Sequence, residues 1–236
     1  TGLAYVVGKP VMYYAPIFAG IDPEDGRQMW YLPGDNPDVC TTDNGTTKTF
    51  DETSLMQNTG KVRRAPVYGG FSLAGAWRGF SMQADFSYVL GKTLINNDKY
   101  FYANPNVFPE QNYHKCVADF WTPENTDAFY PAAYGMGKSN DGYNVMVNDR
   151  YMLNMAYLRL KNLTVGYTLP KRWTDKADID GVRFYFSGEN LYYWSPLKKN
   201  CLYVDPESAF SRSSDVNNHM SYTWQKTMMF GIDITF

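Results

Sequence analysis

Few residues of this chain have the type and spacing that a chemical site requires. The two histidines, His114 and His219, stand in no pattern that spaces ligands around a metal ion. The three cysteines, Cys40, Cys116 and Cys201, allow at most one internal disulfide and lack the CxxC spacing of metal and redox sites, so a bridge and reduced thiols both stay open. The motifs GxSxG and HExxH and a phosphate-binding glycine loop are absent from the sequence. We therefore expect no catalytic residue, metal site or cofactor, and an enzyme is the least favoured class.

One short stretch, 139–144 (SNDGYN), is rich in Asp and Asn. Its side-chain oxygens are ligands of the kind that calcium takes. The same composition is typical of a solvated turn, which we favour without excluding a weak calcium site.

Aromatic side chains are the better candidates for recognition. The chain has 14 Phe, 20 Tyr and 6 Trp, a heavy aromatic load. Flat rings stack on sugar faces and pack against partner proteins, and binding residues concentrate on loops. Each ring alone is more typical of a loop core, but the set favours a binding surface. The rings that we expect to contact a substrate or partner are Trp30, Tyr100, Tyr102, Trp121, Tyr130, Tyr134, Tyr193 and Trp194.

Charge and hydropathy exclude two classes of protein. The net charge is -2 and the 22 Lys and Arg residues are scattered, which disfavours nucleic acid as a partner. Mean hydropathy is -0.45, and no apolar run approaches the roughly 18–20 residues of a helical membrane span. A β-barrel is not excluded, because half of its strand residues are polar. The first residues, TGLAYVVGKP, lack the features of a signal peptide, so we expect a processed N-terminus or the tail of a longer chain.

The last residues, 222–236 (YTWQKTMMFGIDITF), alternate with a period of two. The even positions read Tyr, Trp, Lys, Met, Phe, Ile, Ile and Phe, and the odd positions are mostly polar. This pattern predicts a β-strand whose two faces meet different surroundings. The apolar stripe ends on Phe236, whereas a soluble domain usually ends in a polar tail. Such a stripe is typical of a transmembrane β-barrel, where it faces lipid and its last aromatic lies at the interface.

Other segments repeat this alternation. Residues 80–90 (FSMQADFSYVL) and 182–190 (VRFYFSGEN) predict strands, and 71–77 should join the first of them through the tight turn Arg78-Gly79. An earlier pair, 8–19 and 27–32, surrounds a turn at 22–26. No stretch shows a convincing helical period. The fold class that we expect is all-β.

The links between the predicted strands are very unequal in length. Links 78–79 and 169–181 are short, whereas 33–66, 92–155 and 191–221 are long. Structureless loops of that length are unusual in a compact domain but normal on the outer side of a bacterial outer-membrane barrel. Alternating strand direction, counted back from a periplasmic Phe236, places all three long links outside the cell.

The position of Lys226 refines the prediction for the last strand. Lys226 precedes Phe236 by ten residues on the same stripe, a rise of roughly 25 Å in a strand tilted near 40°, which is about the height of the apolar band. Lys226 should therefore lie at the outer rim, although in an ordinary sheet it would be a solvated side chain. The girdle residues that we expect at the membrane interfaces are Tyr88, Tyr222, Trp224, Lys226 and Phe236.

The segment 157–169 changes phase. Its leucines 158 and 160 are at even positions, whereas the apolar residues from 163 onward are at odd positions. A one-residue slip reverses the faces of a strand, so we predict a β-bulge near Lys161-Asn162 that turns Arg159 and Lys161 toward the barrel interior. The alternative is that the outer half of this strand stands above the membrane.

A family resemblance covers most of the chain. It resembles the C-terminal part of SusC-like (RagA/SusC) TonB-dependent transporters of the Gram-negative outer membrane, most specifically across 157–191. The segments that carry the resemblance are 20–26 (GIDPEDG), 65–70 (APVYGG), 77–91 (WRGFSMQADFSYVLG), 157–170 (YLRLKNLTVGYTLP), 182–191 (VRFYFSGENL), 204–207 (VDPE) and 230–236 (FGIDITF).

The resemblance implies a large plugged β-barrel that imports nutrients with energy from TonB and is capped by a SusD-like surface lipoprotein. Barrels of this type have ~22 strands, so this chain of about six or seven strands would be the C-terminal segment 1–236 of one. The plug and the segment that contacts TonB are then outside it, and the rest of the barrel should pair with both edges of its sheet.

Two functions remain open. The first is an outer-membrane, multi-pass transporter with a periplasmic C-terminus that imports oligosaccharides, or alternatively oligopeptides. The second is a soluble secreted β-sandwich that binds glycans, which would also use period-two strands and aromatic loops. We favour the transporter, because a sandwich has no reason to end on Phe236.

Overall fold

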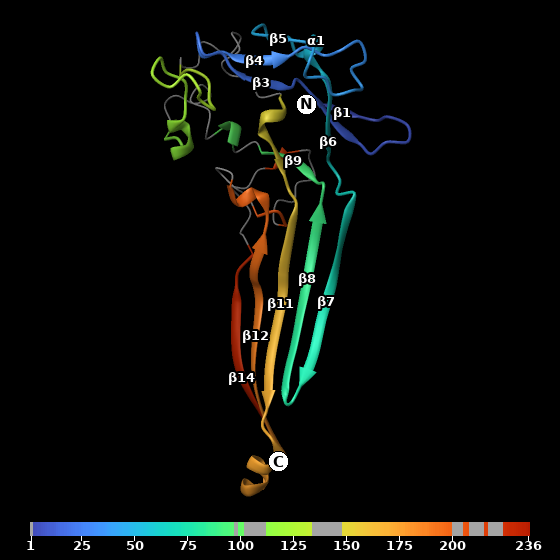
Figure 1. Ribbon diagram of the computed structural model, residues 1–236, viewed down its shortest axis with the longest axis vertical. Coiled ribbons are helices and arrows are strands. Elements are labelled where there is room, and N and C mark those ends of the chain that lie inside the picture. The colour runs from blue at the N-terminus through green and yellow to red at the C-terminus, as the bar shows by residue number, and fades with distance from the viewer. Residues whose placement is uncertain are drawn as a thin grey trace. The chain divides into compact units, whose positions relative to one another are not determined.

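A computed structural model describes residues 2–96, 99–101, 112–133, 148–199, 205–207, 215–216 and 224–236. The described chain consists mainly of antiparallel strands with a few short helical turns, which confirms the predicted all-β class (Figure 1). No helix within these ranges is long and apolar enough to cross a membrane. The strand number and the closure of a complete barrel stay predictions.

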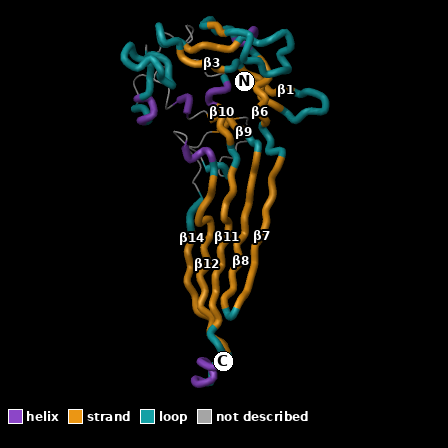
Figure 2. Tube along the Cα trace, in the orientation of Figure 1, coloured by secondary structure: helices purple, strands orange, loops and turns teal. Residues whose placement is uncertain are grey.

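The chain forms two compact units. The sheet unit comprises Val67–Leu90, Ala156–Pro196 and Tyr222–Phe236, and the loop unit comprises the rest. One five-stranded antiparallel sheet makes up the sheet unit, in the order β14-β12-β11-β8-β7 (Figures 1 and 2). Its strands are β7 (Val67–Trp77), β8 (Phe80–Leu90), β11 (Tyr157–Thr168), β12 (Gly181–Trp194) and β14 (Thr227–Thr235).

The β7–β8 turn has the predicted position. Arg78 and Gly79 have φ angles of 47° and 88°, the pair of positive values that a two-residue type I′ hairpin needs. A Cβ on Gly79 would lie 2.7 Å from the carbonyl oxygen of Thr168, so a glycine is required here. β7 begins four residues before the predicted start, because Val67 still pairs with Leu90.

The strand register places all long links at one end of the sheet. Val67 lies opposite Leu90, Leu158 opposite Trp194, and Glu189 opposite Thr227 near the start of β14. We call this the link end, and the opposite end, which carries the Arg78-Gly79 turn, the turn end. The link between β11 and β12 at the turn end contains the helical turns α3 (Lys171–Thr174) and η4 (Asp175–Ala177), which are too short for a helical period to reveal.

The predicted bulge in β11 is confirmed. Leu160 pairs with Phe86, but Asn162 pairs with Asp85, so Lys161 is an extra residue in the ladder. Arg159 pairs with Ser87 and therefore lies on the polar face of the sheet, as predicted.

The partner strand β12 has a matching irregularity. Leu160 lies opposite Tyr192 whereas Asn162 lies opposite Glu189, and Asn190 between them has a φ of 51°. Sequence alternation did not reveal this second irregularity.

Deleting Lys161 should disrupt the sheet unit. With the extra residue gone, 157–160 shift by one position, which turns Arg159 to the apolar face and Leu158 and Leu160 to the polar face. We expect a large loss of folded protein, measured as the protease-resistant fraction of the full-length protein. Lys161→Ala is the control, since it removes the side chain and keeps the register, and it should fold normally. A deletion variant that folds as well as the control would contradict this role of the bulge.

The loop unit contains three small sheets and several helical turns. The first sheet has the order β1-β2-β6, the second β3-β4-β5 and the third β10-β9-β13. The strand bounds are β1 (Gly2–Ala4), β2 (Met12–Ala15), β3 (Phe18–Ile21), β4 (Gln28–Tyr31), β5 (Thr46–Thr47), β6 (Gln57–Val62), β9 (Thr93–Asn96), β10 (Met152–Asn154) and β13 (Asp215–Val216). The helical turns are α1 (Glu52–Leu55), η1 (Lys115–Ala118), η3 (Asp149–Tyr151) and η5 (Pro196–Lys199), the last of which begins in the sheet unit.

These elements correct three predictions. The expected strand 8–19 is two strands, β2 and β3, in different sheets, because Pro16 between them has no backbone N–H for a continuous ladder. The turn 22–26 does join β3 to β4, as predicted. The long links 33–66 and 92–155 are not structureless, and the N-terminal strands belong to the loop unit, which leaves five strands in the long sheet.

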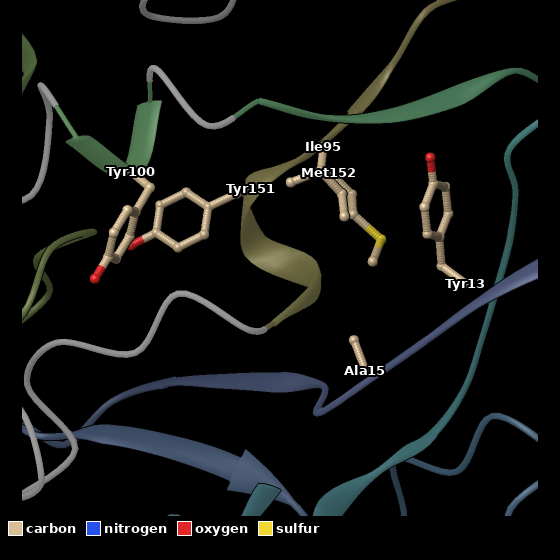
Figure 3. Close-up of a cluster of buried hydrophobic side chains, with 6 residues drawn as sticks. All are labelled: Tyr13, Ala15, Ile95, Tyr100, Tyr151 and Met152. Atoms are coloured by element: carbon tan, nitrogen blue, oxygen red, sulfur yellow. The ribbon is translucent and has the colours of Figure 1, made fainter. Parts of the chain in front are cut away.

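The loop unit has a hydrophobic core of its own. In Figure 3 the rings of Tyr100 and Tyr151 lie against each other, and their centroids are 5.5 Å apart in an edge-to-face contact. The same cluster contains Tyr13 and Ala15 of β2, Ile95 of β9 and Met152 of β10. A second cluster consists of Leu94, Leu153, Met155 and Leu197. Segments far apart in the sequence therefore fold together, and much of the predicted loop surface is interior.

Candidate functional site

The five-stranded sheet has one apolar face. Cross-strand pairs share a face, so the register assigns each side chain directly. Ring contacts hold the face together, among them Phe71–Phe86 at 4.8 Å and Phe186–Phe230 at 5.0 Å between centroids. The large side chains on this face include Val67, Phe71, Leu73, Trp77, Phe80, Met82, Phe86, Tyr88, Leu90, Leu158, Leu160, Leu163, Val165, Tyr167, Val182, Phe184, Phe186, Tyr192, Trp194, Met228, Phe230, Ile232 and Ile234.

This apolar face is exposed rather than buried. Phe230 in the middle of β14 is 81% exposed, and most of the large apolar side chains on the face are exposed as well. The 11 residues of β8, at ~3.3 Å each and tilted near 40°, span roughly 25 Å, the height of the apolar band of an outer-membrane barrel. An exposed apolar surface of this extent marks contact with a membrane or a partner protein.

The opposite face is polar and carries hydrogen bonds between strands. Asn162 donates from Nδ2 to Oδ2 of Asp85 at 3.3 Å, and Gln83 donates to the same carboxylate. The hydroxyls of Thr164 and Ser187 lie 3.4 Å apart. The guanidinium of Arg159 and the ring of Tyr193, both near the link end, stack at 4.7 Å. The two faces of one sheet thus suit an apolar and an aqueous environment.

Aromatic residues lie at both ends of the apolar face. Of the predicted girdle residues, Tyr88 is on the apolar face near the link end, exposed Lys226 directly precedes β14, and exposed Phe236 follows it at the turn end. Exposed Trp224 lies before β14 and under the ammonium group of Lys161, at 5.0 Å from Nζ to the ring centroid. Tyr222 is outside the described residues.

The predicted contact residue Trp194 lies at the link end of the apolar face, near Tyr88. It pairs with Leu158 and contacts the ring of Tyr192 at 4.9 Å, so it shares the apolar face. Tyr193 points to the polar face, beside Arg159. Two neighbouring residues that we assigned to one contact surface are therefore on opposite faces of the sheet.

The other described aromatic candidates belong to the loop unit, and three of them are core residues. Trp30 has an exposed fraction of 0% and packs with Leu55, while Tyr100 and Tyr130 are also buried. Their burial does not fit a direct surface contact. The sequence did not reveal this, because its pattern cannot separate a loop core from a loop surface. Tyr102 and Tyr134 are outside the described residues.

Trp121 remains partly accessible beside the turn 22–26. Its Nε1 donates to the carbonyl oxygen of Pro23 at 3.2 Å. Its ring covers Gly26, whose φ is 71° and whose missing Cβ would lie 2.7 Å from the ring. Asp22 in the same turn pairs with Lys48, and this hydrogen bond lowers the pKa of the Asp22 carboxyl group. The turn is thus fixed from both sides and positions Trp121.

Arg150 and Lys99 form a cluster that sequence pattern did not reveal. Both side chains are buried in the loop unit, and both lie over the ring of Phe129, with Arg150 Cζ at 5.0 Å and Lys99 Nζ at 4.7 Å from its centroid. Burial, with the nearby Arg150 charge, lowers the pKa of Lys99 to about 8. The two residues are far apart in sequence and stand in no motif, so only the tertiary structure brings them together.

The lowered pKa of Lys99 predicts a pH dependence of stability. Because the folded-state pKa lies below the ordinary value of 10.5, folding favours the neutral amine, and stability should rise as pH increases from about 8 to about 10.5. We expect the protease resistance of the loop unit to increase over that range. Lys99→Met should remove most of the increase, and an unchanged pH profile in that variant would contradict the assignment.

No group of three or more His, Cys, Asp or Glu side chains within the described ranges is arranged to hold a metal ion. Cys40 is a free, exposed thiol. Several candidate residues lie outside the described part of the chain, namely His219, Cys201, 139–144 and the side chain of Cys116. The predictions about calcium binding and a disulfide therefore stay untested.

Comparisons with known proteins agree with this geometry. No family model matches the sequence. Two proteins of Formosa agariphila are similar to it, TonB-dependent receptor P26 with 33% identity over 129 residues and TonB-dependent receptor P3 with 29% identity over 127 residues. Each match covers 51% of this chain, and the chain covers 12% of each receptor's length.

Solved structures match over the whole chain. The RagAB peptide transporter superimposes with a TM-score of 0.76 and 31% identity, over 100% of this chain and 24% of that one. The RagAB peptide importer in its open-open state gives a TM-score of 0.73, also with 31% identity, over 100% of this chain and 23% of that one. Sequence identity and fold therefore both support the resemblance that the sequence analysis found: this chain is similar to part of a SusC/RagA-like TonB-dependent transporter.

Proposed function

We propose that this chain forms part of the wall and the loops of an outer-membrane β-barrel that imports nutrients in a TonB-dependent manner. The observation that carries the proposal is the two-faced sheet, whose exposed apolar face has the height of a membrane and whose other face is polar. An outer-membrane location follows from the similarity to TonB-dependent receptors and to RagAB. In this arrangement the apolar face contacts lipid and the polar face lines the barrel interior.

The two ends of the sheet support one orientation of this part of the barrel. The turn end, with Phe236, faces the periplasm, and the link end faces outward with Trp194, Trp224 and Lys226 at the outer interface. Trp and Tyr rings are typical of both interfaces, and a lysine there reaches toward polar head groups. The edge strands β7 and β14 pair with the rest of the barrel, because an open apolar-faced edge would aggregate.

The substrate that we favour is an oligopeptide, because the solved structures that match the whole chain are peptide importers. An oligosaccharide is the second candidate, supported by the heavy aromatic load of the loop segments. The resemblance also implies a SusD-like surface lipoprotein as partner, with TonB bound by a segment outside this chain. Trp121 and Tyr193 are the described candidates for contact with substrate or partner, since they stay partly accessible.

Uptake by whole cells tests this function. Cells with and without the gene for the full-length protein would receive fluorescent oligopeptides or oligosaccharides, with TonB intact or disrupted. We expect uptake of one class that needs both the gene and TonB, with peptides the more effective. Uptake that is equal with and without the gene, or a protein that is soluble without detergent, would contradict the proposal and favour a secreted glycan-binding protein.

A further inference from the structure

Two buried cations in the loop unit share one aromatic ring. Arg150 belongs to η3 and is 8% exposed, and Lys99 follows β9 and is 7% exposed. Both lie about 5 Å from the centroid of the Phe129 ring, which itself is 39% exposed. The pair therefore lies just beneath a ring at the surface of this unit.

The guanidinium of Arg150 has aromatic neighbours but no hydrogen-bond acceptor. Phe18, Phe129, Tyr130 and Tyr151 surround it at 4.9–5.1 Å. Its Nε, Nη1 and Nη2 atoms are buried, and none has a hydrogen-bond partner among the described residues. Ring faces attract a cation, but they do not replace acceptors for the N–H groups that lie in the guanidinium plane.

The carboxylate of Asp149, which precedes Arg150 in the chain, has other partners. Asp149 accepts from the backbone N–H of Phe18 at 2.8 Å through Oδ1. Its Oδ2 pairs with Lys61 Nζ at 2.8 Å. The described part of the chain therefore supplies neither Arg150 nor Lys99 with an ion-pair partner.

Two unpaired buried cations are unfavourable for the folded state, since burial of a charge is costly unless an opposite charge and hydrogen bonds compensate. The lowered pKa of Lys99 is a consequence of this environment. Arginine keeps its charge, and its planar set of donors matches the two oxygens of a carboxylate. The cluster thus has the donors and the charge that suit an anionic group.

We propose that Arg150 and Lys99 form a subsite for a carboxylate group of the imported ligand, which enters when the Phe129 ring moves aside. This inference rests on the proposed import function and adds a substrate class to it, namely ligands with a free carboxylate. Two sources share that chemistry: the C-terminal carboxylate of an oligopeptide and the carboxylate of a uronic acid residue in an oligosaccharide.

Equilibrium binding to the purified full-length protein tests the subsite. The probes are pentaalanine and its C-terminal amide for the peptide source, and trigalacturonate and its methyl ester for the glycan source. For one of the two pairs we expect the free acid to bind about 10-fold or more tightly than the capped form, as for a charge-assisted hydrogen bond. The pair that shows the difference identifies the source.

Arg150→Met should weaken binding of the free acid to the level of the capped form and leave the capped form unchanged. Arg27→Met is the matched control, because it removes one positive charge from the same unit at a partly exposed residue paired with Asp25. This control should retain the preference for the free acid. The Arg150→Met protein should be no less stable than the wild type against thermal unfolding, because an apolar side chain replaces a buried unpaired charge.

Three results would overturn the subsite. Equal binding of free and capped probes to the wild-type protein would reject it while leaving import intact. Equal loss of both forms in Arg150→Met, with lower thermal stability, would show a purely structural role. Binding of none of the four probes would reject the subsite, and normal gene-dependent and TonB-dependent uptake by cells would then show that the import function itself survives.

Discussion

Arginine in place of Ile232 should destabilise the full-length protein by about 2–4 kcal/mol, which is the cost of a lipid-facing arginine near the middle of a membrane. Ile232 lies near the middle of β14 on the apolar face, opposite Phe184 of β12, and its side chain is exposed. On the surface of a soluble protein, a substitution at such an exposed position usually changes stability by no more than about 0.5 kcal/mol. The same substitution therefore has very different effects in lipid and in water.

The measurement is equilibrium unfolding of the protein in lipid bilayers, compared between two variants. Met229→Arg is the matched control, since it places the same side chain on the polar face of the same strand, opposite Ser187. We expect the control to be close to wild type and Ile232→Arg to be clearly less stable. Equal stability of the two variants would mean that the apolar face does not contact lipid.

Alanine in place of Trp30 should destabilise the loop unit by about 3–5 kcal/mol, the usual cost of removing a large aromatic side chain from a core. Trp30 is fully buried, with the ring of Phe50 at 5.1 Å and that of Phe18 at 6.1 Å. Its Nε1 has no hydrogen-bond partner in the described chain, so the loss comes from packing.

Hydrogen exchange of residues 2–62 in the full-length protein would measure this loss. Protection of β3 and β4 should fall strongly in Trp30→Ala and remain unchanged in Tyr5→Ala, which truncates an exposed ring of the same unit. If Trp30 were instead the contact residue that the sequence predicts, ligand binding would fall while protection stayed at the wild-type level. That outcome would contradict the core assignment.

The sheet unit was largely predictable because its signals are local. Period-two alternation in 80–90 and 227–235 is imposed by the strand itself when its faces meet different surroundings. The Arg78-Gly79 turn needs positive φ angles, which a glycine in the sequence indicates. The phase change around Lys161 directly indicates the register shift. Each of these features depends on residues within one or two strands.

The loop unit and its cluster of Arg150 and Lys99 were not predictable, because their contacts join segments that are far apart in the sequence. Whether Trp30 is a core ring or a contact ring depends on segments far away in sequence, as does the approach of Lys99 to Arg150. The face of Trp194 was equally hidden, because it depends on the irregularity of β12 at Asn190 opposite the β11 bulge. A break such as Pro16 was visible, but not the two different sheets that its flanking strands join.

The central claim is that one face of the five-stranded sheet contacts lipid. A scan of single spin labels at positions 228–235 of the full-length protein in bilayers tests it most directly, after Cys40, Cys116 and Cys201 are replaced by serine. Oxygen dissolves in the apolar layer, so collision rates with oxygen should peak at 228, 230, 232 and 234 and drop at 229, 231, 233 and 235. Uniform oxygen accessibility along the strand, or peaks at the odd positions, would contradict the account.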